Sequence, residues 1–277
     1  MSNLVLFTNR SGSTVLADLL AYVDGSVNLG EGLHSLARDY NYNTEANRQT
    51  KLYQEFSKES LTGTYHSRAT RGSDHIGFFK AKQKRIELLK NTTEQWTVKE
   101  NIEKLTIDIP FIEYCANAGV DIWLTHRRDV VSQFISKINA RYRSEVANHN
   151  HDSNFIYTNH CTFTDYDMMK IKFHWLHMYT NVFLEQLMLW RIIYEKFKSY
   201  PTLKIVDYES EIKPMALEEC GIGGADVLKY RLERNHLIPT PLNAVNVIVE
   251  DDHKKPIAGA WQQALYYIER HKYLVEV

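Results

Sequence analysis

The segment "TNRSGST" (Thr8–Thr14) lies between a short apolar run, "LVLF" (Leu4–Phe7), and a helix-like run, "VLADLLAYV" (Val15–Val23). A strand, a tight turn rich in Gly, Ser and Thr, and then a helix form an arrangement that holds phosphate groups, because the unpaired N–H groups at a helix N-terminus attract anions. The lysine of the usual P-loop pattern, G-x-x-x-x-G-K-S/T, is absent, and Arg10 is the cation of this segment. The segment therefore predicts an anion site that uses an arginine.

Each residue of the turn is of a type that suits anion binding. Gly12 lets the backbone approach a ligand closely, and the hydroxyl groups of Ser11, Ser13 and Thr14 are hydrogen-bond donors. Arg10 can present two parallel donors to two oxygens at once. The alternative interpretation is structural: the turn leads into an ordinary helix with Ser13 or Thr14 as its N-cap.

Strand-like runs alternate with helical patterns along the chain. The strand-like runs, of which the second is the weakest, are 4–7, 26–30, 96–99, 121–125 and 203–208. The helical patterns are 13–23, 111–119, 129–142 and roughly 166–199. This alternation predicts an α/β fold with a central, mostly five-stranded parallel sheet flanked by helices. Ligands of such folds bind at the carboxyl ends of the strands, so functional residues are expected in the loops that follow the strands.

The composition is that of an ordinary globular protein. The chain has 277 residues, of which 44% are hydrophobic and 24% charged, and its formal net charge is −1. The length suits one domain over 1–277, and the balanced charge argues against nucleic acid as a partner. No apolar run is long enough to predict a membrane span, and the first residues leave no room for a signal peptide. The three cysteines lie far apart, so a reducing, cytoplasmic location is expected.

A second pattern follows the predicted strand 121–125. In "HRRDVVSQFIS" (126–136), Arg128 stands where the strand ends, and Ser136 lies eight residues later, two turns into the next helix. An arginine and a serine at this spacing can converge on one further anion beside the first site. For either residue alone, the more ordinary interpretation is a solvent-facing arginine or a serine on a helix.

Together, "RSGST" (Arg10–Thr14) and "RRDVVSQFIS" (127–136) resemble the sulfotransferase family, whose members use 3′-phosphoadenosine-5′-phosphosulfate (PAPS) as sulfuryl donor. In that family a loop of the form R/K-x-G-S/T-S/T binds the 5′-phosphosulfate, and an Arg and a Ser eight residues apart bind the 3′-phosphate. The resemblance thus implies a P-loop-like sulfotransferase fold, with Arg10–Thr14 at the 5′-phosphosulfate and with Arg128 and Ser136 at the 3′-phosphate. The sequences of the two motifs are most similar to those of bacterial trehalose-type and carbohydrate-type sulfotransferases.

Other stretches extend the comparison with this family. The run "IVDYES", which contains Tyr208, is similar to the family's late strand, and the similarity implies that Tyr208 lies near the adenine. The C-terminal "RKGxxGxW" segment of the cytosolic members has no counterpart in the chain, and Lys254 and Lys255 are candidates to replace its contacts. The stretches 40–90 and 143–165 are expected to be variable loops on the acceptor side.

Several residues are candidates for the base that takes the acceptor's proton. Cytosolic members carry a Lys-x-His unit after the third strand, with His as the base; here "WTVKEN" has Lys99 at the Lys position but Asn101 at the His position. An amide cannot serve as this base. In trehalose-type enzymes a Glu in the region after the second strand is the proposed base, and the resemblance assigns that role to Glu31 of "NLGEGLH", with His34 or a residue of 143–165 as alternatives. Lys99 is expected to stabilise charge on the transferring group or the bridging oxygen.

The resemblance therefore implies a sulfotransferase that moves the sulfuryl group of PAPS to a hydroxyl or amine of a small-molecule or carbohydrate acceptor. No metal is expected, because the His-containing stretches 149–161 and 174–177 lack the spacing of zinc ligands and the transfer needs none. Two alternatives stay open. A P-loop-like nucleotide-dependent kinase would need a magnesium-binding Asp at a strand end, for which Asp207 is the candidate. A non-catalytic protein would bind PAPS, or its product 3′-phosphoadenosine-5′-phosphate (PAP), without a base.

Overall fold

The computed structural model describes residues 1–8, 11–33, 45–58, 75–103, 106–138, 169–212, 214–215 and 247–277. The chain divides into two compact units. The first comprises Met1–His126 with Ile192–Arg231, and the second comprises Arg127–Arg191 with Leu232–Val277. The single-domain organisation stays a prediction. Among the described residues, no helix combines the length and the apolar character that crossing a bilayer requires.

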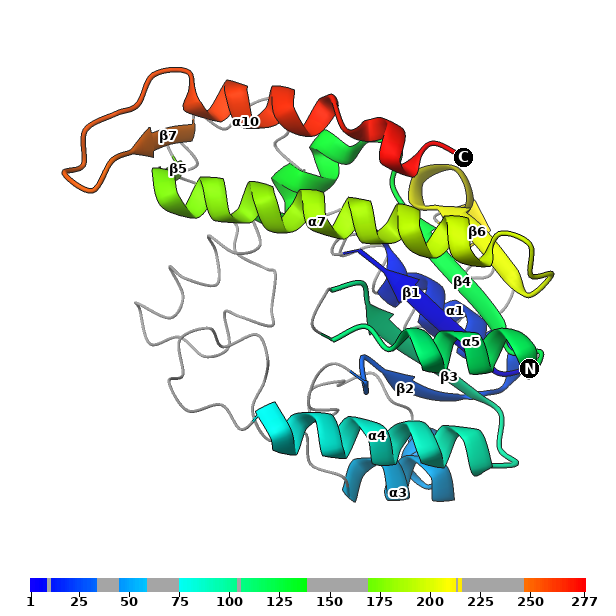
Figure 1. Ribbon diagram of the computed structural model, residues 1–277. Coiled ribbons are helices and arrows are strands. Elements are labelled where there is room, and N and C mark those ends of the chain that lie inside the picture. Colours follow the sequence, from blue (N-terminus) through cyan, green and yellow to red (C-terminus); the bar gives the residue numbers. More distant parts are fainter. Residues whose placement is uncertain are drawn as a thin grey trace. The chain divides into compact units, whose positions relative to one another are not determined.

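The first unit is built on a parallel sheet with the strand order β2-β3-β1-β4-β6 (Figure 1). Its strands are β1 (Asn3–Phe7), β2 (Val27–Gly30), β3 (Trp96–Asn101), β4 (Asp121–His126) and β6 (Leu203–Asp207). All five agree with the predicted strands to within two residues, because strands buried on both faces form continuous apolar runs. The predicted α/β fold with a five-stranded parallel central sheet is confirmed.

β1 is the central strand and the point at which the winding of the chain reverses. Leu4–Leu6 are completely buried. The side chain of Asn3 joins β1 to both neighbours, since its amide donates to Thr97 Oγ1 on β3 (3.2 Å) and its oxygen accepts from Trp123 Nε1 on β4 (2.9 Å). Because the chain passes from β3 to β4 across β1, the carboxyl ends of these strands form the switch point at which open α/β sheets bind ligands.

Two predicted helices lie close to their expected positions in this unit. They are α1 (Ser13–Asp24), which follows β1, and α5 (Ile109–Asn117), which follows β3. α5 begins at an N-cap, Asp108, with Pro110 in its first turn, and Gly119 lies just beyond its end in the left-handed conformation. Sequence signals at the helix ends therefore agree with the structure.

The expectation of a variable loop over 40–90 is wrong for the described part of that stretch. It contains α2 (Glu45–Arg48), α3 (Lys51–Lys58) and α4 (His75–Asn91). α3 packs against α4 and next to β2 (Figure 1). The apolar periodicity of α4 is hidden in the sequence because its buried residues include two cations, Lys82 and Arg85.

The second unit combines helices with a small parallel sheet. Its elements are a helix at 130–138, β5 (Met169–Lys172), α7 (Phe173–Phe197, of which the residues from Ile192 group with the first unit), β7 (Val247–Glu250), α10 (Ala260–Glu269) and a 3₁₀ turn, η4 (Lys272–Val275). The helix expected from 166 begins only at Phe173. The preceding residues form β5, in which Ile171 is buried between the exposed Lys170 and Lys172, the period of a strand.

Aromatic rings from three segments form part of the core of the second unit. The Phe134 ring lies 5.4 Å from the ring of Phe183 on α7 and 6.3 Å from that of Trp261 on α10, measured between centroids. Phe134 belongs to the helix 130–138 that carries Ser136. This packing fixes the orientation of that helix within its unit.

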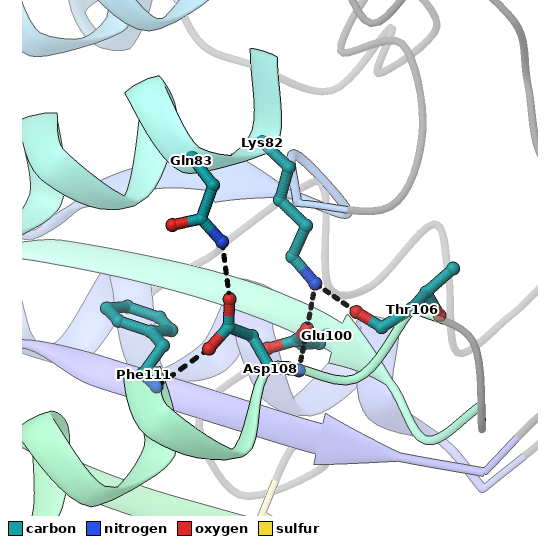
Figure 2. A network of polar contacts seen from close by, with 6 residues as sticks. All are labelled: Lys82, Gln83, Glu100, Thr106, Asp108 and Phe111. Carbon is teal, nitrogen blue, oxygen red and sulfur yellow. Dashed lines mark hydrogen bonds and ion pairs between the residues drawn. The ribbon is translucent and has the colours of Figure 1, made fainter. Parts of the chain in front are cut away.

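A buried polar network fastens the end of β3 to α4 and α5 (Figure 2). The Lys82 ammonium donates to Glu100 Oε1 and to the carbonyl oxygen of Thr106. The N–H of Asp108 donates to the same Glu100 oxygen (3.1 Å), and the Asp108 carboxylate accepts from the N–H of Phe111 (2.9 Å) in the first turn of α5. Burial raises the pKa of Glu100 above its ordinary value, and the opposing effect of Lys82 does not cancel it.

This raised pKa predicts a dependence of stability on pH that Glu100→Gln should remove. The native state holds the Glu100 proton more tightly than the unfolded chain, so the stabilisation from protonating Glu100 is complete below the ordinary carboxyl pKa and is lost as pH rises through the native pKa. Urea denaturation at a series of pH values from about 4 upwards measures this. The free energy of unfolding of wild type minus that of Glu100→Gln should fall with rising pH. A difference that rises with pH would show that the Lys82 contact outweighs burial.

Candidate functional site

The loop after β1 leads directly into α1 at the switch point. Gly12 is the N-cap of α1, with φ 79° in the left-handed region, and no side chain among the described residues caps this helix start. The N–H of Leu16 donates to the Gly12 carbonyl (3.2 Å) and begins the helix. The alternative expectation of Ser13 or Thr14 as N-cap is therefore wrong, because the chain turns into the helix one residue earlier. Arg10 lies outside the described residues.

Ser11 ties this loop to β4. Its hydroxyl is completely buried and lies 2.6 Å from Thr125 Oγ1, which itself donates to the carbonyl of Leu6 on β1 (3.3 Å). Since the Thr125 hydroxyl has one hydrogen, Ser11 is the donor to Thr125. The side chain of Ser11 thus holds the loop against the sheet.

The Lys99 ammonium is the centre of the site. Its Nζ donates to Thr14 Oγ1 at the start of α1 (2.7 Å) and to Glu31 Oε1 after β2 (2.9 Å), and it lies 5.0 Å from the centroid of the Phe7 ring. The side chain of Lys99 is 1% exposed and that of Glu31 is 26% exposed. A buried cation therefore joins the anion-type loop to a carboxylate that solvent can reach. Because Thr14 Oγ1 accepts from Lys99, the Thr14 hydroxyl can still donate its own hydrogen to a ligand.

Tyr208 lies against the loop from the other side of β1. It is the first residue of a π-helical turn, η3 (Tyr208–Ile212), that follows β6, and it is half-buried. A Cβ atom added to Gly12 would overlap the Tyr208 ring. Only a glycine therefore allows both the left-handed turn and this ring contact.

A buried His–Asp contact at neighbouring strand ends escaped the sequence analysis. His126 ends β4 and Asp207 ends β6, and His126 Nε2 lies 3.7 Å from Asp207 Oδ2. Asp207 Oδ1 also accepts from the N–H (2.9 Å) and the hydroxyl (2.7 Å) of Ser210 in η3. These contacts fix the turn that carries Tyr208. The only sequence signal for this contact is that His126 and Asp207 each follow an apolar run. No local pattern indicates that two residues so far apart in the sequence lie side by side.

Arg128 and Ser136 belong to the second unit. β4 ends at His126, so Arg128 lies in the turn before the helix 130–138, where it is exposed, and Ser136 is half-buried in the second turn of that helix. Asp129 between them begins the helix, since its Oδ1 accepts from the N–H of Ser132 (2.8 Å) and its Oδ2 accepts from the Ser132 hydroxyl. The strand, turn and helix expected from the sequence are present, with Arg128 two residues beyond the strand end.

The structure thus brings seven of the predicted site residues together in the first unit. They are Ser11, Gly12, Ser13 and Thr14 of the loop, Lys99 and Glu31 at the ends of β3 and β2, and Tyr208 of η3. His34 and the stretch 143–165 lie outside the described residues. The amide of Asn101 is buried and donates to Glu103 Oε1 (2.9 Å).

Within the described ranges, no group of His, Cys, Asp and Glu side chains is arranged to hold a metal ion. The chain matches no protein-family model, no curated protein and no solved structure.

We expect Gly12→Ala to destabilise the protein more than Gly25→Ala. Both glycines have left-handed φ angles, but a Cβ at Gly25 meets no atom, whereas one at Gly12 overlaps the Tyr208 ring. The strained backbone should cost about 1 kcal/mol at either position, and the overlap should add about 1–3 kcal/mol at Gly12. Urea denaturation of both variants measures the difference, and Tyr208→Ala in the Gly12→Ala background should recover part of it. Equal losses at the two glycines would contradict the ring contact.

Proposed function

We propose that this protein is a PAPS-dependent sulfotransferase with a P-loop-like sulfotransferase fold. The observation that carries the proposal is the Lys99 ammonium, which donates to Thr14 on the loop and to Glu31 beside it. Sulfuryl transfer needs an anion site, a positive charge near the bond that breaks and a base near the acceptor. The loop can bind the anion, Lys99 carries the positive charge, and Glu31 can act as the base. All three lie together at the carboxyl ends of the strands.

The loop at Gly12 is assigned to the 5′-phosphosulfate of the donor. The N–H groups in the first turn of α1 carry partial positive charge, and the Thr14 hydroxyl can donate to the same anion. By the resemblance of "RSGST" to the sulfotransferase loop, Arg10 adds its guanidinium there. The ring of the half-buried Tyr208, which lies against Gly12, is assigned to the adenine.

Glu31 is assigned the role of base and Lys99 that of charge stabiliser. The acceptor oxygen or nitrogen attacks the sulfur as the bond from sulfur to the bridging oxygen breaks, and PAP leaves with the electron pair of that bond. The acceptor's proton moves to the Glu31 carboxylate, which is partly exposed and can be reached from solvent. The Lys99 ammonium stabilises the negative charge that grows on the bridging oxygen.

The two alternatives differ from this proposal at particular residues. A kinase would need a carboxylate that can bind magnesium, but Asp207 is buried, accepts two hydrogen bonds from Ser210 and lies 3.7 Å from His126. A non-catalytic PAPS-binding protein would need the loop but no base. A turnover assay with labelled PAPS, labelled ATP and a panel of small hydroxyl compounds and carbohydrates separates all three functions.

If Glu31 is the base, Glu31→Gln should retain PAP affinity and lower the turnover of PAPS by about two to four powers of ten, since an amide cannot take the proton. Calorimetry with PAP and the labelled-donor assay measure the two effects. The control is Glu113→Gln, which removes an exposed carboxylate of α5 and should leave both quantities unchanged. Turnover near the wild-type rate in Glu31→Gln would exclude this base and direct the search to His34.

Arg128→Ala should weaken binding of PAP much more than binding of adenosine 5′-phosphosulfate, which lacks the 3′-phosphate. Loss of a charge-assisted, bidentate contact to the 3′-phosphate should cost about 2–3 kcal/mol for PAP. Calorimetry with both nucleotides makes the comparison, with Arg127→Ala at the adjacent arginine as the matched control. Equal weakening of the two nucleotides would show that Arg128 does not recognise the 3′-phosphate.

A further inference from the structure

Helix α4 carries two cations that are almost completely buried. Lys82 and Arg85 are each 1% exposed. They are three residues apart, so they project from the same side of the helix. A buried cation is strongly destabilising unless it is bonded to oxygen atoms or stacked on a ring, so the partners of these two residues indicate what they hold in place.

Lys82 holds the residue that follows Lys99. Its ammonium donates to Glu100 Oε1 and to the carbonyl of Thr106 (Figure 2). Glu100 comes directly after Lys99 on β3, and successive side chains of a strand point to opposite faces of the sheet. Lys82 therefore fixes β3 from one face at the point where Lys99 projects from the other.

Arg85 holds the residue that follows Glu31. Its Nη1 donates to the carbonyl oxygen of Gly32, and its guanidinium carbon lies 4.7 Å from the centroid of the Phe56 ring on α3. A Cβ atom on Gly32 would overlap the same ring, so the backbone of the turn lies directly on Phe56. The turn that presents Glu31 is therefore fixed by one guanidinium and one aromatic ring.

We propose that Lys82 and Arg85 are positioning residues that set the Glu31–Lys99 contact. Lys82 bonds to Glu100, which follows Lys99, and Arg85 bonds to Gly32, which follows Glu31. Both contacts come from one face of α4, so a shift of this helix would move Lys99 and Glu31, which contact each other, at the same time. The catalytic meaning of this arrangement rests on the proposed function, in which Glu31 is the base and Lys99 the charge stabiliser. The rival account is that the two cations only stabilise the fold.

The test is a double-mutant cycle at Glu31 and Lys99, repeated in several backgrounds. Glu31→Gln, Lys99→Met and the double variant are made in wild type, in Arg85→Met and in Leu89→Ala, and the unfolding equilibrium constant of each is measured in urea. Leu89 is a buried residue of α4 one turn beyond Arg85, so Leu89→Ala destabilises the same helix while the Arg85–Gly32 bond stays. The coupling between Glu31 and Lys99 should change the equilibrium constant by about fivefold or more in wild type.

The coupling should persist in Leu89→Ala and fall to less than about twofold in Arg85→Met. Loss of coupling in both backgrounds, or persistence in both, would overturn the proposal. If Arg85→Met does not fold, Arg85→Gln takes its place, because it also removes the guanidinium that donates to Gly32 while keeping a polar side chain; full coupling in Arg85→Gln would likewise overturn the proposal. PAP binding by wild type, measured by calorimetry on the same preparation, tests the proposed function separately, since its absence would leave the coupling result unaffected.

Discussion

The arrangement of the site at the carboxyl ends of the strands depends on the contacts of the buried Lys99 ammonium. An ammonium at 1% exposure is tolerable only where oxygen atoms and a ring surround it. Its oxygen partners, Thr14 and Glu31, come from two other segments of the chain, and the Phe7 ring comes from β1. The start of α1, the turn after β2 and the pairing of β1 with β3 must therefore all be correct before this cation can be buried.

Charge is distributed unevenly along the sheet of the first unit. At its amino-terminal end the fully buried polar side chains are neutral: Asn3 donates to Thr97, and the hydroxyls of Thr97 and Ser26 lie 2.7 Å apart. The carboxylates there, Asp24 and Asp121, are only partly buried. At the carboxyl end they are ionisable, with Lys99 on one face of β3, Glu100 on the other, and a His–Asp contact at the ends of β4 and β6. The chain thus concentrates its buried ionisable groups at the end where parallel sheets bind their ligands.

The sequence predicts the strands of this sheet well and the helices beside it unevenly. Buried parallel strands are continuous apolar runs, so β1, β3, β4 and β6 are readily recognised. α4 was missed because two of its buried positions are Lys82 and Arg85, which a search for apolar periodicity counts as exposed. Glu31 and Lys99 were found by resemblance, but their contact depends on β2 lying next to β3, and strand order is not encoded in any local pattern.

In the proposed transfer, Glu31 is both the base and the counter-ion of the buried Lys99 ammonium. While Glu31 is ionised, its charge compensates that of Lys99. When the acceptor's proton reaches Glu31, this compensation is lost, and the buried ammonium gains by turning toward any other negative charge within reach. In sulfuryl transfer, negative charge grows on the bridging oxygen of the donor at that same stage. Deprotonation of the acceptor and stabilisation of the leaving group would then be coupled through one side chain, so precise placement of the Glu31–Lys99 contact would matter more than the strength of either group alone.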